Sequence, residues 1–233
     1  MELIVITGER FGQDGCPEGL RLGGSEQGPG NGAQGQDGGS PPDRLGGSEQ
    51  KLVEEMFRTG LQRLHLRKPG ASERQLAEWL ERIDPQYHRR IVIHDCFELA
   101  RRYRLGGIHL NSRNPAVPDW IPPEMTVSRS CHSLKELAEW KSRCNYLFLS
   151  PIFNSISKHG YGSGFTAEEL AGSGLIDAKT VALGGVTSEN LYVLKGLGFG
   201  GAAVLGTVWK SPDPVSQVRA LLSSLQSLHQ EPF

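Results

Sequence analysis

Short apolar runs recur along the chain, and most of them are followed by polar residues or glycine. Segments with apolar residues at helical spacing separate these runs, an arrangement typical of parallel strands that are buried on both faces. The pattern therefore predicts eight strands that alternate with helices. They lie within 2–7, 61–67, 91–93, 107–110, 125–128, 146–149, 181–187 and 200–206.

Capping signals mark where several of the intervening helices begin. Ser72 and Thr166 are each followed three residues later by Gln or Glu, which forms a capping box. Four prolines within 115–123 predict a loop after the fourth strand. Eight strands alternating with helices favour a closed (β/α)8 TIM barrel over an open sheet, and the chain is long enough for one such domain over 1–233.

The segment 12–50 differs in composition from the rest of the chain. It has 13 glycines in 39 positions and few large apolar side chains, so we predict that it is disordered. It also holds an imperfect tandem repeat, because 12–15 and 21–27 recur 23 residues later as 35–38 and 44–50. A mobile lid and an insertion without a role are both open interpretations. The composition favours the second, and we expect the segment to be dispensable for folding.

The charge balance excludes some classes of partner. The chain has 25 Lys and Arg against 26 Asp and Glu, a net charge of -1, which predicts no surface for nucleic acid or an anionic membrane. No apolar run is long enough to span a membrane, and the N-terminal residues lack the basic region of a signal peptide. Four cysteines without metal-ligand spacing indicate reduced thiols, so we expect a cytoplasmic protein with no structural zinc. A homo-oligomer stays open.

Two glycine-ended strands near the C-terminus predict a phosphate site. Gly184 and Gly185 follow the seventh strand, and Gly206 follows the eighth. Glycine lets backbone N–H groups approach a phosphate closely, and in TIM barrels the loops after strands 7 and 8 frequently bind one. Ordinary turn glycines are the alternative, and a single Gly-Gly pair would favour it. Two such strand ends favour phosphate binding.

The other strand ends carry cations, histidines and hydroxyl groups. The carboxyl ends of barrel strands meet at one mouth, so these side chains would converge on an anionic substrate with phosphate groups. Single residues allow more than one interpretation. Asp95 could bind a metal or cap a helix, His132 could act as an acid/base or lie in a surface turn, and His109 fits a structural histidine best. The set comprises His65, Arg67, His94, Asp95, His109, Asn114, Ser130, His132, Ser155, Ser157 and Lys158.

Taken together, these motifs resemble the thiamine phosphate synthase and TenI family of (β/α)8 barrels. The resemblance covers residues 1–11 and about 51–220, and it leaves the repeat as an insertion. Its most specific parts are the loop after the sixth strand and the turn after the seventh. The matching segments are 65–69 (HLRKP), 94–95 (HD), 109–114 (HLNSRN), 129–133 (RSCHS), 150–158 (SPIFNSISK) and 184–187 (GGVT).

For the synthases, the resemblance implies that hydroxymethylpyrimidine diphosphate condenses with thiazole phosphate to give thiamine phosphate and pyrophosphate. Carried over, Arg67 and Lys158 would neutralise the departing diphosphate. Asp95 and Asn114 would correspond to the Mg²⁺ site of the family. The other implied substrate-binding positions are His65, His94, Ser130, Ser155 and Ser157, with Gly185 and Gly206 at the thiazole phosphate.

Three positions depart from the synthase pattern. Asn114 stands where the family has a second metal-binding aspartate, Ser112 replaces a glutamine, and Pro69 replaces a lysine. Lys68 is adjacent to that position, but strand alternation predicts that it points the other way. All three losses fall at the diphosphate and metal end.

Two other functions are therefore alternatives to the synthase. TenI-type thiazole tautomerases need only proton transfer, for which His132 would be the acid/base, although Ser157 stands where the well-known tautomerase has a cysteine. A non-catalytic protein that binds thiazole or thiamine phosphates is the third candidate. The synthase is favoured because Arg67, Asp95 and Lys158 are present.

Overall fold

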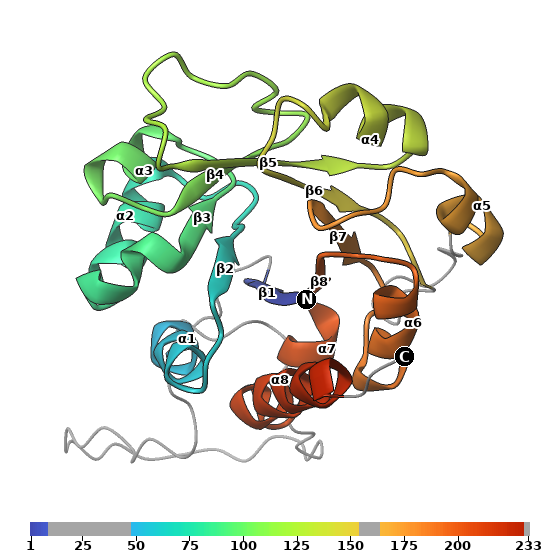
Figure 1. Cartoon of the computed structure of the whole chain (residues 1–233). Coiled ribbons are helices and arrows are strands. Elements are labelled where there is room, and N and C mark those ends of the chain that lie inside the picture. Colours follow the sequence, from blue (N-terminus) through green and yellow to red (C-terminus); the bar gives the residue numbers. More distant parts are fainter. Residues whose placement is uncertain (9–47, 154–163, 231–233) are drawn as a thin grey trace, which may run out of the picture.

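A computed structural model describes residues 1–8, 48–153 and 164–230, which form a closed barrel (Figure 1). Within these residues, eight parallel strands pair in sequence order, and β1 pairs with β8 to close the barrel. The fold prediction is confirmed. The strands are β1 (Glu2–Ile6), β2 (Arg63–Leu66), β3 (Ile91–Ile93), β4 (Gly107–Leu110), β5 (Thr126–Cys131), β6 (Tyr146–Leu149), β7 (Thr180–Leu183) and β8 (Gly201–Val204).

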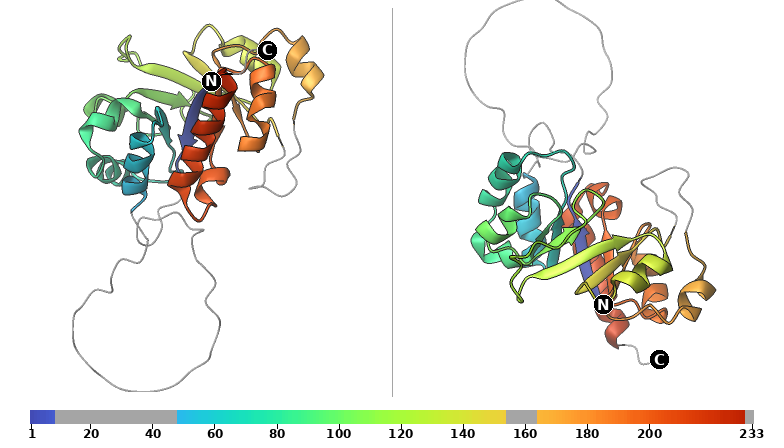
Figure 2. Two further views of the ribbon diagram at one scale, coloured as in Figure 1. Left: turned by 60° about the horizontal axis from the view of Figure 1, so that its bottom comes forward. Right: turned by 90° about the horizontal axis from the view of Figure 1, so that it is seen from above.

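The helices lie around the outside of the barrel (Figures 1 and 2). Ser72 and Thr166 form the predicted capping boxes, and the proline-rich stretch after β4 contains no helix. None of the helices in the described part of the chain combines the length and hydropathy needed to cross a membrane. The helices are α1 (Glu49–Arg58), α2 (Glu73–Glu81), α3 (Glu98–Arg102), α4 (Leu134–Trp140), α5 (Ala167–Gly172), α6 (Leu191–Gly196), α7 (Gly206–Trp209) and α8 (Pro214–Gln230), with 3-10 turns at Pro85–Arg90 and Ser188–Asn190.

Strand β5 extends three residues beyond its predicted end. Arg129 and Cys131 pair with Leu147 and Leu149 of β6, so the ladder continues where the polar sequence suggested a loop. Ser128 and Ser130 consequently point into the barrel, and Cys131 is buried on the helix side. The interior tolerates these hydroxyl groups because each bonds a histidine, so local polarity did not indicate the strand end.

The barrel interior is divided between apolar and polar side chains. Ile4, Ile6, Phe148, Val181 and Ala203 form an apolar cluster on one side. On the side of β2, β4 and β5 the interior residues are histidines and serines that are hydrogen-bonded to one another. The larger apolar cluster fills the space between the strands and the helices. The site is thus built on a barrel whose wall is polar on one side.

A buried ion pair fixes the end of the segment that was predicted as an insertion. Both Glu49 carboxylate oxygens contact Lys68 Nζ, at 2.8 and 2.9 Å, and Trp79 Nε1 donates to the same carboxylate. The Glu49 and Lys68 side chains are each 1% exposed. Burial raises the pKa of Glu49 and lowers that of Lys68, and the opposite charge of each partner counteracts the shift. Lys68 points toward the helices, as alternation predicted.

Helix α1 begins at Glu49, so it includes the last two residues of the segment 12–50. Ser48 precedes α1, and Glu49 and Gln50 are buried residues of that helix, because the carboxylate of Glu49 is needed to neutralise Lys68. The prediction of disorder for 12–47 lies outside the described residues. Because Glu49 and Gln50 are buried in α1, we expect the last residues of 12–50 to contribute to stability.

We expect two deletions of the repeat to differ in stability. Deleting 12–34 keeps Glu49, so the free energy of unfolding should change by less than about 1 kcal/mol, since loop length contributes weakly. Deleting 12–50 removes the buried carboxylate, and the loss should reach about 3 kcal/mol or more. Urea unfolding measures both. Glu49→Gln is the point control and should resemble the longer deletion; equal stability of the two deletions would contradict this role of Glu49.

Candidate active site

A cavity of about 750 Å³ opens at the carboxyl ends of the strands. Arg67 after β2, His94 after β3 and Ser130 of β5 line it together with residues that follow β6, β7 and β8. Its wall also includes apolar side chains such as Ile6 and Phe148. The structure thus brings together most of the described residues that the sequence predicted. The predicted site residues on this wall are Arg67, His94, Ser130, His132, Gly185 and Gly206.

The remaining predicted residues lie elsewhere. His65 is fully buried beneath the cavity, and Asp95 and Asn114 lie at the end of β3 and in the loop after β4. Ser155, Ser157 and Lys158 lie outside the described residues, so their roles stay predictions.

The two glycine-ended turns form one wall of the cavity. Gly184 and Gly185 have φ values of +100° and +65°, and a Cβ on Gly184 would come within 3.1 Å of Pro151 Cα. Asn190 Nδ2 donates to the Gly185 carbonyl at 2.9 Å, which holds the turn in place. The wall therefore consists of backbone at the position where the sequence predicted a phosphate.

A hydrogen-bonded histidine pair lies at the base of the cavity. His65 Nδ1 and His94 Nε2 are 2.9 Å apart, and His65 Nε2 is 2.8 Å from the Tyr146 hydroxyl. His65 is predicted to bind substrate, but its ring is covered by these partners, so it supports His94 from below. His94 and His109 stack with centroids 4.2 Å apart.

His109 bonds hydroxyl groups through both ring nitrogens. Its Nδ1 is 2.8 Å from Ser128 Oγ, and its Nε2 is 2.8 Å from Ser130 Oγ, as expected for a structural histidine. It also lines the cavity, with the other strand-end residues that the sequence placed at this mouth. Burial, together with the charges of Arg67 and Arg129, lowers the pKa of His109 to about 3. The ring is therefore neutral at pH 7.

The pKa values of His65 and His94 are also lowered well below the usual histidine value. Burial is the largest cause, and neighbouring histidine and arginine charges add to it. Among the described residues, His65, His94 and His109 are the group whose ligand atoms lie within 4.8 Å of one another. Both ring nitrogens of His65 and of His109 already have hydrogen-bond partners, so the trio forms a polar core rather than an open metal site.

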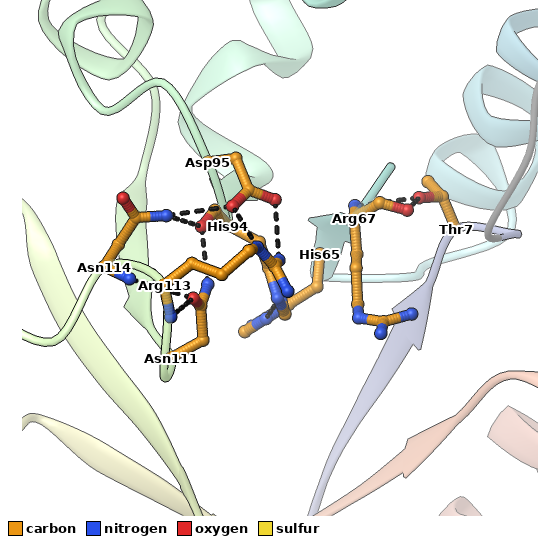
Figure 3. Close-up of polar contacts among 8 residues, drawn as sticks. All are labelled: Thr7, His65, Arg67, His94, Asp95, Asn111, Arg113 and Asn114. Atoms are coloured by element: carbon orange, nitrogen blue, oxygen red, sulfur yellow. Dashed lines mark hydrogen bonds and ion pairs between the residues drawn. The ribbon is translucent and has the colours of Figure 1, made fainter. Parts of the chain in front are cut away.

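Asp95 is enclosed by nitrogen donors (Figure 3). Arg113 binds it in a two-pronged contact, Nε to Oδ1 at 3.1 Å and Nη2 to Oδ2 at 3.0 Å. Asn114 Nδ2 donates to Oδ1 at 2.9 Å. Mg²⁺ binds oxygen ligands in octahedral geometry, and these contacts do not form such a set. A magnesium ion at this site stays a prediction of the resemblance. The contacts of Asp95 fit a guanidinium partner better than a metal ion.

Thr7 holds the backbone of Arg67 just after β2 (Figure 3). The Arg67 backbone N–H donates to Thr7 Oγ1 at 2.9 Å, and that hydroxyl donates to the Arg67 carbonyl at 3.0 Å. Thr7 is fully buried. Sequence reasoning missed it, although a threonine at the end of the first strand was the available signal.

His132 follows β5 and contacts the start of the loop after β6. Its Nδ1 lies 3.2 Å from both the carbonyl oxygen and the hydroxyl of Ser150, and its backbone N–H donates to Glu136 Oε2 at 2.7 Å. The ring lines the cavity, so His132 is positioned as part of the site rather than in a remote surface turn.

The comparisons with known proteins identify the family. The family model described as thiamine monophosphate synthase matches residues 40–208. The chain belongs to the thiamine monophosphate synthase family. A crystal structure described as thiamine phosphate pyrophosphorylase from Bacteroides thetaiotaomicron is 32% identical to this chain and has a TM-score of 0.72. The similarity covers 97% of this chain and 98% of that one. A Pyrococcus furiosus structure of the same description is 19% identical, has a TM-score of 0.67, and shares the fold over 97% of this chain and 96% of its own.

Curated members of the thiamine monophosphate synthase family are similar over most of the chain. The thiamine-phosphate synthase of Parasynechococcus marenigrum is 30% identical over 183 residues, which is 74% of this chain and 52% of that protein. The chain thus spans about half the length of this relative. The thiamine-phosphate synthase of Photorhabdus laumondii is 28% identical over 69% of this chain and 79% of its own.

The neutral state of His109 predicts how stability depends on pH. A histidine in the unfolded chain titrates near pH 6.5, so below that pH the unfolded chain binds a proton that folded His109 does not bind. The free energy of unfolding should therefore fall on acidification below pH 6.5, with His109 contributing up to about 1.4 kcal/mol per pH unit. In His109→Gln this dependence should be shallower. Urea unfolding between pH 7 and pH 5 measures it, and parallel curves for the two proteins would contradict a neutral His109.

Proposed function

We propose that this chain condenses hydroxymethylpyrimidine diphosphate with thiazole phosphate to give thiamine phosphate and pyrophosphate. The observation that carries the proposal is that arginines and glycine turns from different strand ends line one cavity. Arg67 and Arg113 follow β2 and β4, whereas Gly185 and Gly206 follow β7 and β8. Two phosphorylated substrates would place their phosphates at these two sets of residues and their rings between them.

The volume and the lining of the cavity support this substrate class. About 750 Å³ lies within the range of small-molecule sites, roughly 300–1,000 Å³. The apolar side chains of Ile6, Phe148 and Ala203 would face the two rings. Excluding water in this way strengthens the attraction between the arginines and a diphosphate.

In the proposed reaction, the C–O bond between the pyrimidine methylene and the diphosphate breaks, and the thiazole nitrogen forms a C–N bond to that carbon. Arg67 neutralises the charge that develops on the departing pyrophosphate. Backbone N–H groups near Gly185 and Gly206 hold the thiazole phosphate. The neutral rings of His94 and His109 do not repel a carbocation, as imidazolium ions would.

His132 supports a second candidate, the thiazole tautomerase. It lies in the cavity wall beside Ser150, where a proton-transfer group could reach a thiazole ring. That reaction releases no pyrophosphate, so the two functions differ in their products.

The decisive measurement is pyrophosphate release coupled to thiamine phosphate formation from both substrates. Arg67→Gln should lower kcat/KM by about 100-fold or more, as expected for loss of a charged donor at the leaving group. Lys158→Ala should abolish turnover if the resemblance assigns it correctly. Arg74→Gln, on the exposed face of α2, is the matched control and should have the wild-type rate. Conversion of thiazole carboxylate phosphate without pyrophosphate release, lost in His132→Ala, would instead establish the tautomerase.

A further inference from the structure

The loop after β4 is held against the end of β3 in a single arrangement (Figure 3). Asn111 Oδ1 accepts the backbone N–H groups of Arg113 and Asn114, at 2.9 and 3.1 Å. Asn111 Nδ2 donates to the His94 carbonyl at 2.7 Å, and Asn114 Nδ2 contacts the same oxygen at 3.2 Å. The backbone from which Arg113 projects is therefore fixed before any ligand binds.

The Arg113 side chain is fixed in turn by Asp95. Its Nε and Nη2 atoms both contact the Asp95 carboxylate, so one edge of the guanidinium is occupied by these hydrogen bonds. The Asp95 side chain is 17% exposed, whereas that of Arg113 is 48% exposed and lines the cavity. A planar guanidinium held along one edge still presents its other edge to a phosphate oxygen.

Arg113 and Arg67 lie on either side of His94. Both residues line the cavity together with His94, and both charges contribute to the lowered pKa of that histidine. Neutral His94 does not add a third positive charge between them. Two arginines thus line the cavity after β2 and β4, whereas the glycine turns follow β7 and β8.

We propose that the Arg113 guanidinium, positioned by Asp95 and Asn114, occupies the place of a divalent cation, so that this chain binds a diphosphate group without a metal. The inference rests on the proposed function for the identity of the ligand as a diphosphate. Asp95 is then a positioning residue for Arg113, and Asn114 completes the enclosure of its carboxylate. A second carboxylate at position 114 would repel Asp95 and attract a metal, whereas the amide donates a hydrogen bond to it.

The first test measures binding of inorganic pyrophosphate to the full chain by calorimetry, once in EDTA and once with excess Mg²⁺. We expect the Kd in EDTA to stay within about threefold of that with Mg²⁺, and Arg113→Gln to weaken binding at least about tenfold in EDTA. Arg74→Gln is the control for a lost surface charge and should bind as the wild type does. Binding that is lost in EDTA and restored by Mg²⁺ would overturn the proposal, as would unchanged affinity in Arg113→Gln.

A second test asks whether the chain can be converted to metal binding. The double variant Arg113→Ala/Asn114→Asp removes the guanidinium and supplies a second carboxylate beside Asp95. Electron paramagnetic resonance of Mn²⁺ should show no bound ion in the wild type at equimolar metal, and a bound ion in the double variant. Bound Mn²⁺ in the wild type, lost in Asp95→Asn, would overturn the proposal.

Synthase turnover separates this inference from the proposed function. Thiamine phosphate formation that continues in EDTA supports both. Formation that requires Mg²⁺ supports the function and overturns the metal-free site. Metal-independent pyrophosphate binding without any turnover supports the site and contradicts the synthase.

Discussion

The free-energy cost of burying polar side chains inside the barrel is the constraint on which the rest of this structure depends. TIM-barrel interiors are usually filled by branched apolar residues, but here β2, β4 and β5 contribute His65, His109 and Ser128. Each of these side chains must find a hydrogen-bond partner, since an unsatisfied buried polar group costs about 1–3 kcal/mol. The resulting network reaches the cavity at His94 and Ser130, so the packing of the core also orients part of the site.

The burial of these side chains in the barrel interior, away from water, also sets the charges of the site. It lowers the pKa values of His65, His94 and His109, so these three imidazoles are neutral, whereas a guanidinium stays protonated in such surroundings. The carboxylate of Asp95 is paired with Arg113. Arginines and glycine turns therefore line one cavity, as expected for the two phosphorylated substrates of the proposed reaction.

Several site residues could be predicted because strand ends have a known position in a parallel barrel. Arg67, His132 and the glycine turns line the cavity as that rule requires. The rule could not predict the partners across strands. Thr7 supports Arg67 from 60 residues away, and Arg113 reaches Asp95 over 18 residues. These contacts depend on which strands are neighbours and on how far each loop extends, and neither is encoded in the local pattern.

The sequence by itself determined the eight strands, the order of the helices and the end of the barrel at which polar strand-end residues gather, because strands buried on both faces read as short apolar runs. The family was indicated separately, by the resemblance of the strand-end motifs. The tertiary structure decided which polar residues are structural and which are functional. Glu49 looked like the end of a polar insertion and is buried against Lys68, while Asp95 looked like a metal ligand and is held by an arginine. The physical reason is that the free energy of a charge depends on its desolvation and its partners, which exist only once the chain has folded.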